Sequence, residues 1–147
     1  MKIRLSEYLW NAEFSTIGIL AGLTPWCIRF GMDMGKKVLL VEDDRISRES
    51  LEYLLRGLGH EVHAVWSAEE AKSTLLTFSP DIALLDVRLP GLPGDAFAVY
   101  LKHKFPAVKI IFVSGEFRLD EPERFGPEVD FLPKPLDFTR LLATLKD

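Results

Sequence analysis

The sequence predicts an α/β fold in which helices cover both faces of a parallel sheet, and three observations lead to this prediction. First, the runs 38–41 and 82–85 are apolar throughout and the run 108–113 is apolar except for Lys109, as is typical of strands buried on both faces. Second, segments with apolar residues at helical spacing separate these runs, and such alternation implies right-handed crossover connections. Third, 147 residues with 48% hydrophobic and 27% charged residues have the composition of one globular domain.

The first half of this pattern contains two strands and two helices. The strand at 38–41 precedes a helix over 45–58, and a weaker strand follows over 61–66. Ser67 and Glu70 form a capping box, because a hydroxyl and a carboxylate at this spacing can each accept a free backbone N–H at the start of a helix. The side chains expected to face the core are Ile46, Leu51, Leu54, Leu55 and Leu58 on the first helix, and Ala71, Leu75 and Phe78 on the second.

The second half contains three strands and two helices. A helix over 94–105 separates the apolar strands at 82–85 and 108–113, and a short edge strand is expected over 129–132. Asp137 can cap the last helix, since its carboxylate can accept backbone N–H groups of the first turn. The side chains expected to face the core are Phe97, Leu101 and Phe105, and then Phe138, Leu141, Leu142 and Leu145.

Charge and cysteine content exclude several classes of protein. Lys and Arg total 18 and Asp and Glu total 22, for a net charge of −4 and a pI near 5.4. A protein that binds nucleic acid on its own needs a basic face to neutralise phosphates, so we expect no direct nucleic-acid partner. The single cysteine, Cys27, can form no internal disulfide, and no Cys/His cluster for zinc exists. A reducing, cytoplasmic location is therefore expected.

Residues 1–35 differ from the rest of the chain and form a separate N-terminal extension. The apolar stretch 14–30 contains Pro25 and Arg29 and is shorter than the ~20 residues of a membrane-spanning helix, so no membrane association is expected. It also lacks the features of a signal peptide. Three interpretations remain: a packing or dimerising segment, a loose tail, or residues upstream of a true start at Met34.

Polar residues follow the predicted strands directly. Glu42 and Asp43 follow the first strand, Asp86 the third, Ser114 the fourth and Lys134 the fifth. Each of them alone has a simpler explanation, as a helix cap, a turn residue or a solvated lysine. Parallel strands, however, bring their carboxyl ends to one edge of the sheet, where converging carboxylates repel one another unless a cation binds. Oxygen ligands favour Mg²⁺, and together with a lysine and a hydroxyl they indicate phosphoryl transfer to a carboxylate.

Four motifs resemble the receiver domain of bacterial two-component response regulators. These are VLLVEDD (38–44), IALLDVRLPG (82–91), IIFVSG (110–115) and DFLPKP (130–135). Each motif alone is weak, but together they occur in the family's order over 36–147. The resemblance implies a flavodoxin-like, doubly wound sheet of five parallel strands in the order 2-1-3-4-5.

The resemblance also implies roles for individual residues. Asp44 lies one place beyond the family's acidic pair, so we interpret it mainly as a charge at the helix start. The implied roles are Asp86 as phosphoacceptor; Glu42, Asp43, Asp86 and the Arg88 backbone carbonyl as Mg²⁺ ligands; Lys134 as the contact to the phosphoryl group; Ser114 as the switch hydroxyl; and Phe131 as the switch aromatic. The Lys134–Pro135 bond is typically cis in the family.

Some features depart from the family pattern. The stretch 114–134 is shorter than usual, so its helix is expected to be short, near 121–125. Arg88 and Glu116 occupy positions that tune hydrolysis of the acyl phosphate in relatives. The chain stops at Asp147 with no helix-turn-helix, which predicts a single-domain regulator.

The implied function is a signalling phosphoacceptor that assists its own phosphorylation and dephosphorylation, not an enzyme. Its expected partners are a sensor histidine kinase or a histidine phosphotransfer protein, and a downstream protein target. Three alternatives remain. A haloacid dehalogenase-type phosphatase would need a second acid at the position of Arg88. A flavodoxin-like electron carrier would need a phosphate loop after the first strand. A receiver-like module could bind partners without being phosphorylated.

Overall fold

The computed structural model describes residues 35–115, 125 and 128–146. Five parallel strands form one sheet in the order β2-β1-β3-β4-β5. The strands are β1 (Lys37–Val41), β2 (Glu61–Val65), β3 (Ile82–Asp86), β4 (Lys109–Ser114) and β5 (Val129–Pro133). The helices are α3 (Arg45–Gly57), α4 (Ala68–Thr74), α5 (Gly94–Lys104) and α6 (Phe138–Lys146). Both the predicted fold class and the predicted strand order are confirmed.

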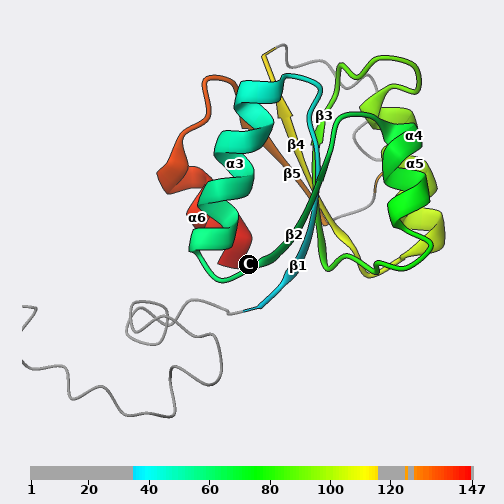
Figure 1. The fold of residues 1–147 in the computed structure, drawn as a ribbon, viewed down its shortest axis with the longest axis horizontal. Helices are drawn as coiled ribbons and strands as arrows, with labels where there is room; N and C mark the ends of the chain where they lie inside the picture. The colour runs from blue at the N-terminus through cyan, green and yellow to red at the C-terminus, as the bar shows by residue number, and fades with distance from the viewer. Residues whose placement is uncertain (1–34, 116–124, 126–127, 147) are drawn as a thin grey trace, which may run out of the picture. The chain divides into compact units, whose positions relative to one another are not determined.

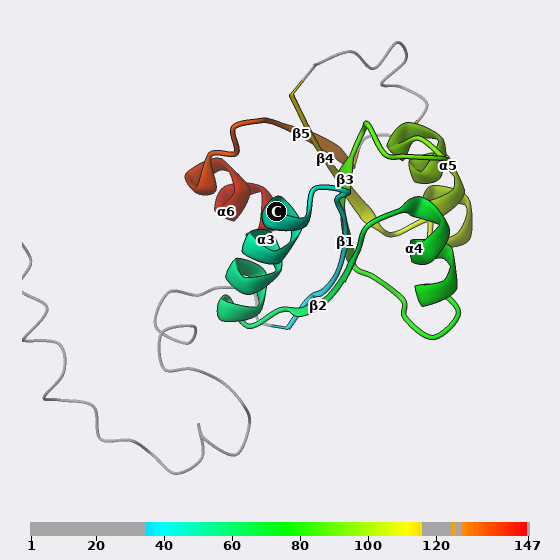
Figure 2. The ribbon, with the colours of Figure 1, turned by 45° about the horizontal axis from the view of Figure 1, so that its top comes forward.

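Helices cover both faces of the sheet. In both ribbon views α3 and α6 lie on one side, and α4 and α5 on the other (Figures 1 and 2). Side chains alternate along each strand, so Leu39 and Val41 pack in one core cluster while Val38 and Leu40 pack in the other. Continuous apolar runs are needed for this arrangement, because both faces of the strands are buried.

The predicted helix starts are confirmed by their hydrogen bonds. The Ser67 hydroxyl accepts the N–H of Glu70 at 3.1 Å, and the Glu70 carboxylate accepts the N–H of Trp66 at 3.0 Å. At the start of α6, Asp137 accepts the N–H of Thr139 at 2.8 Å. These side chains satisfy backbone donors that have no partner inside the helix.

Two predictions of core-facing residues are wrong. Ile46 is 76% exposed, because nine residues at about 100° each place it on the opposite side of α3 from the buried Leu55. Phe138 is 57% exposed, since it lies in the first turn of α6, where the helix begins away from the sheet (Figure 1). Leu141 and Leu145 of the same helix are buried as expected.

Several predictions fall outside the described residues. These concern the extension up to residue 34, Glu116, and all but one residue of the short helix near 121–125. Phe125 is described, is buried, and packs edge-on against Phe112 with ring centroids 5.3 Å apart. Among the described residues, no helix combines the length and the apolar character that crossing a membrane requires.

Two lysines hold the C-terminal end of α6. Lys109 Nζ donates to the Thr144 carbonyl at 2.7 Å and lies 3.0 Å from Asp130, and Lys36 Nζ donates to the Leu145 carbonyl at 3.1 Å. Carbonyls in the last turn of a helix have no intrahelical donor and carry the negative end of the helix dipole. Both ammonium groups therefore stabilise the docking of α6.

We expect Lys109→Met to lower the free energy of unfolding by about 1–2 kcal/mol, because it removes a charge-assisted hydrogen bond to α6. Urea denaturation measures this change. Lys37→Met is the matched control, since Lys37 is an exposed lysine at the start of β1. Equal stabilities of the two variants would contradict the stabilising role of Lys109.

Candidate functional site

The strand register brings the predicted site residues to one edge of the sheet. Val41 pairs with Leu85, and Asp86 pairs with Val113, so Glu42 and Ser114 lie on either side of Asp86. Ser114 pairs with Pro133, and the N–H of Lys134 donates to the Ser114 carbonyl at 2.9 Å. Four strands therefore deliver their carboxyl-terminal residues to the same place.

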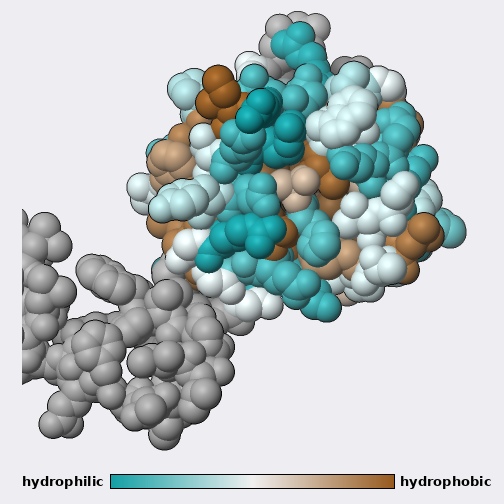
Figure 3. Space-filling model, viewed as in Figure 1, coloured by the Kyte–Doolittle hydropathy of each residue, from teal (hydrophilic) through white to brown (hydrophobic). Residues whose placement is uncertain are grey.

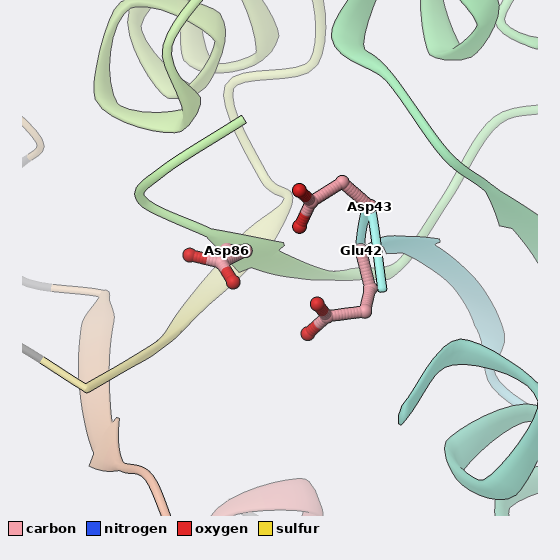
Figure 4. A group of neighbouring side chains, drawn as sticks. All are labelled: Glu42, Asp43 and Asp86. Atoms are coloured by element: carbon pink, nitrogen blue, oxygen red, sulfur yellow. The ribbon is translucent and has the colours of Figure 1, made fainter. Parts of the chain in front are cut away.

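Three carboxylates converge at this edge. Glu42, Asp43 and Asp86 each offer an oxygen, and these oxygens all lie within 4.8 Å of one another. Their side chains point into a common space from the ends of β1 and β3 (Figure 4). Glu42 is only 2% exposed and Asp86 is also buried, whereas Asp43 is exposed.

Lys134 joins the two buried carboxylates. Its ammonium group lies 2.8 Å from Glu42 Oε2 and 2.5 Å from Asp86 Oδ2. Lys134 follows the edge strand β5, so its side chain reaches the acidic cluster across β4. The Lys134–Pro135 peptide bond is cis, as the family resemblance implied.

Burial and ion pairing shift the pKa values of Glu42 and Lys134. Burial raises the pKa of Glu42 above its ordinary value, and the hydrogen bond and charge of Lys134 offset this only in part. Burial alone would lower the pKa of Lys134, but its hydrogen bonds to Asp86 and Glu42 outweigh burial and raise that pKa. The lysine therefore remains charged at neutral pH.

We expect the metal-free protein to lose stability as the pH rises above 4.5, the ordinary pKa of glutamate. The native state binds the Glu42 proton more tightly than the unfolded state, so unfolding releases this proton and becomes easier at higher pH. Urea denaturation in EDTA across this range should show the loss in the wild type and a smaller loss in Glu42→Gln. An equal pH dependence of stability in wild type and Glu42→Gln would contradict this prediction.

The backbone holds Asp86 in place from two directions. The N–H of Arg88 donates to Asp86 Oδ1 at 2.8 Å, which leaves Oδ2 to Lys134. The N-terminal end of α5 packs directly on the Asp86 backbone, since a Cβ atom built on Gly94 would lie 1.9 Å from the Asp86 carbonyl oxygen. Only glycine permits this approach.

Gly94 and Arg48 were not among the predicted site residues. The Arg48 guanidinium donates to the backbone carbonyls of Glu42 at 2.7 Å and Asp43 at 3.1 Å, and so holds the loop that carries both acids. A glycine placed directly after Pro93 at a helix start was the available signal for Gly94. No sequence signal indicated Arg48, because its partners are backbone atoms.

Asp44 has a different role from the two acidic residues before it, Glu42 and Asp43. It caps α3, where its carboxylate accepts the N–H of Ser47 at 2.8 Å, and this hydrogen bond lowers its pKa. The interpretation of Asp44 as a helix-start charge is confirmed.

The predicted switch residues lie on β4 and β5, the two strands beyond β3. Ser114 is buried at the end of β4, one strand from Asp86. Phe131 is half-buried on β5 and stacks on Phe112 with ring centroids 5.3 Å apart. Arg88 is exposed in the loop after β3.

The donor set of the cluster fits a hard divalent cation. All three side chains offer carboxylate oxygens, and oxygen-only sites suit Mg²⁺ better than zinc or copper. A cation there would also relieve the repulsion between carboxylates that Lys134 alone counters only in part. Glu42, Asp43 and Asp86 are thus the residues that could hold Mg²⁺.

Comparison with known proteins identifies the family. Residues 38–146 match the family described as the response regulator receiver domain. The chain belongs to this family. Its receiver domain is 36% identical over 112 residues to the response regulator protein FleR of Pseudomonas aeruginosa and 38% identical over 107 residues to Nodulation protein W of Bradyrhizobium diazoefficiens.

A solved receiver domain shows the same fold. The signal receiver domain of a DNA-binding response regulator from Colwellia psychrerythraea superimposes with a TM-score of 0.68 at 26% identity, covering 76% of this chain and 95% of that one.

The two relatives named are longer than this chain. The match covers 74% of this chain but 24% of FleR, and 71% of this chain but 47% of Nodulation protein W. The receiver domain therefore corresponds to only a part of each relative. The expectation of a single-domain regulator stays a prediction.

Proposed function

We propose that this receiver domain accepts a phosphoryl group on Asp86 from the phosphohistidine of a histidine kinase or a histidine phosphotransfer protein. The observation that carries the proposal is the position of the Lys134 ammonium group between Asp86 and Glu42, inside a cluster of three carboxylates. Membership of a two-component signalling family supports it.

The chain's own residues account for the chemistry. An Asp86 carboxylate oxygen attacks phosphorus, the phosphorus–nitrogen bond breaks, and the imidazole keeps its electron pair. Lys134 balances the negative charge of the phosphoryl oxygens, and the Arg88 N–H orients the attacking carboxylate. Mg²⁺, held by Glu42, Asp43, Asp86 and the Arg88 carbonyl, would supply further positive charge to the same oxygens.

Phosphorylation then changes a surface for a downstream protein. The product adds about 1.5–2 negative charges beside Ser114, whose hydroxyl can donate to the new oxygens. Movement of Ser114 leaves space toward Phe131 on the next strand, and this shifts an equilibrium between two packings of the domain. The result is a phosphorylation-dependent binding surface on the β4–β5–α6 side.

We also propose that the receiver domain comprises residues 36–147 and that 1–35 are an extension, since the family match begins at residue 38. The phosphatase and electron-carrier alternatives lose their basis because the chain belongs to the receiver family. A receiver that binds partners without phosphorylation is the remaining alternative, and labelling separates it from the proposal.

The function is tested by incubating the protein with acetyl phosphate and Mg²⁺ and measuring bound phosphoryl groups by mass spectrometry. We expect one hydroxylamine-sensitive group, and none in EDTA. Asp43→Asn should raise the Mg²⁺ concentration needed by at least about tenfold, because it removes a ligand. The matched control, Asp44→Asn, should behave as wild type, since asparagine also caps helices. Equal effects of the two changes would contradict the metal assignment.

A further inference from the structure

A concave region lies at the same edge of the sheet as the acidic cluster. It is a groove of about 570 Å³ between the start of α4 and the loop after β3, and its walls include Trp66, Glu69, Glu70, Pro90 and Gly91. On the face seen in Figure 3, the surface is mostly hydrophilic with apolar residues scattered among polar ones.

Trp66 is the aromatic side chain that lines the groove. It is 53% exposed, so it offers apolar area and an aromatic ring to a partner. Trp66 follows Val65, which pairs with Val41, and Val41 pairs with Leu85. Two strand spacings, or roughly 10 Å, therefore separate it from the end of β3 at Asp86.

Two carboxylates that line the same groove are each held by a backbone N–H. Glu69 Oε1 accepts the N–H of Leu92 at 3.0 Å, and Glu70 Oε2 accepts the N–H of Trp66 at 3.0 Å. Each carboxylate is thus positioned by one oxygen, and among the described residues neither forms an ion pair with a lysine or arginine. The groove offers two negative charges and an aromatic ring to a partner.

We propose that this groove binds an arginine side chain presented by a partner protein. The positive charge complements Glu69 and Glu70, and a guanidinium group can stack on the Trp66 indole while it donates two parallel hydrogen bonds to a carboxylate. Lysine has a compact, strongly hydrated charge without this planar geometry, so arginine fits the groove better.

The groove shares a wall with the phosphoacceptor loop. The loop that follows Asp86 donates the Arg88 N–H to Asp86 and the Leu92 N–H to Glu69. A partner whose arginine occupies the groove would therefore sit next to Asp86. The docking itself does not depend on phosphorylation of Asp86.

The proposal is tested by NMR titration of the ¹⁵N-labelled full chain with a blocked tetra-arginine peptide, in the presence of Mg²⁺. We expect saturable shifts of the Trp66 indole N–H and of the Glu69, Glu70 and Leu92 amides. A tetra-lysine peptide of equal charge should bind about fivefold more weakly, because it lacks the stacking group. The absence of saturable shifts, or shifts confined to Asp43 and Asp86, would overturn the proposal.

Substitutions inside and outside the groove distinguish specific binding in the groove from general attraction between opposite charges. Trp66→Ala and the double variant Glu69→Gln/Glu70→Gln should each weaken tetra-arginine binding by about tenfold. The glutamines keep an acceptor oxygen for the Leu92 and Trp66 N–H groups, so the fold is preserved. The control Glu49→Gln/Glu52→Gln makes the same charge change on α3 and should leave binding unchanged. Equal affinity of the control and groove variants would overturn the proposal.

Discussion

Asp86→Asn should abolish phosphorylation by acetyl phosphate or by a phosphorylated kinase domain. The asparagine amide fills the same space as the carboxylate but is not a nucleophile, so no acyl phosphate can form. The buried cluster also loses one of its negative charges, which leaves Lys134 paired with Glu42. We therefore expect a folded protein without label, measured by intact-mass spectrometry after incubation with Mg²⁺ and the phosphodonor.

Asp81→Asn is the matched control for this prediction. Asp81 lies immediately before β3, at the opposite end of the strand from Asp86, where it accepts the N–H of Lys37 at 2.8 Å. The same substitution there should leave labelling at the wild-type level. Hydroxylamine-sensitive label of wild-type extent on Asp86→Asn would refute the assignment of the phosphoacceptor.

Gly94→Ala should damage both the stability and the chemistry of the domain. The added Cβ would meet the Asp86 carbonyl oxygen at 1.9 Å, and the clashing atom is backbone, which cannot rotate away. Relief requires α5 and the end of β3 to separate, at a cost of about 1–3 kcal/mol or more. The same shift moves Asp86 relative to Lys134, so the rate of labelling should fall together with the urea midpoint.

Gly57→Ala provides the control, because a Cβ at the end of α3 meets no atom within 4 Å. Alanine is the better helix former, by up to about 1 kcal/mol, so this variant should be at least as stable as wild type. If Gly94→Ala matched Gly57→Ala in stability and labelling rate, the close approach of α5 to Asp86 would have no functional meaning.

Most of the fold could be predicted from the sequence, because the signals for strands and for helix starts are local. Strands β1, β3 and β4 appeared as predominantly apolar runs, and the caps Ser67 and Asp137 marked helix starts within one residue. The errors at Ile46 and Phe138 arose where an apolar residue was assigned to a helix face without regard to its angle or to where the helix ends.

The membership of the candidate site was also predicted from the chain, since parallel strands bring their carboxyl ends to one edge. The burial and the contacts of the individual site residues were harder to predict from the sequence. Glu42 and Asp43 are neighbours with the same charge, yet one is buried against Lys134 and the other is exposed. Successive residues at a strand end point in different directions, and only the packed structure shows which one meets the lysine.

The amino-acid sequence by itself determined the order of strands and helices, the acidic and basic residues at the strand ends, and the family to which they belong. Tertiary structure alone decided the contacts between distant segments: the reach of Lys134 across β4, the approach of Gly94 to Asp86, and the groove beside Trp66. Periodicity and caps act between residues a few positions apart, whereas these contacts join segments that the sheet brings together only after its strands have paired.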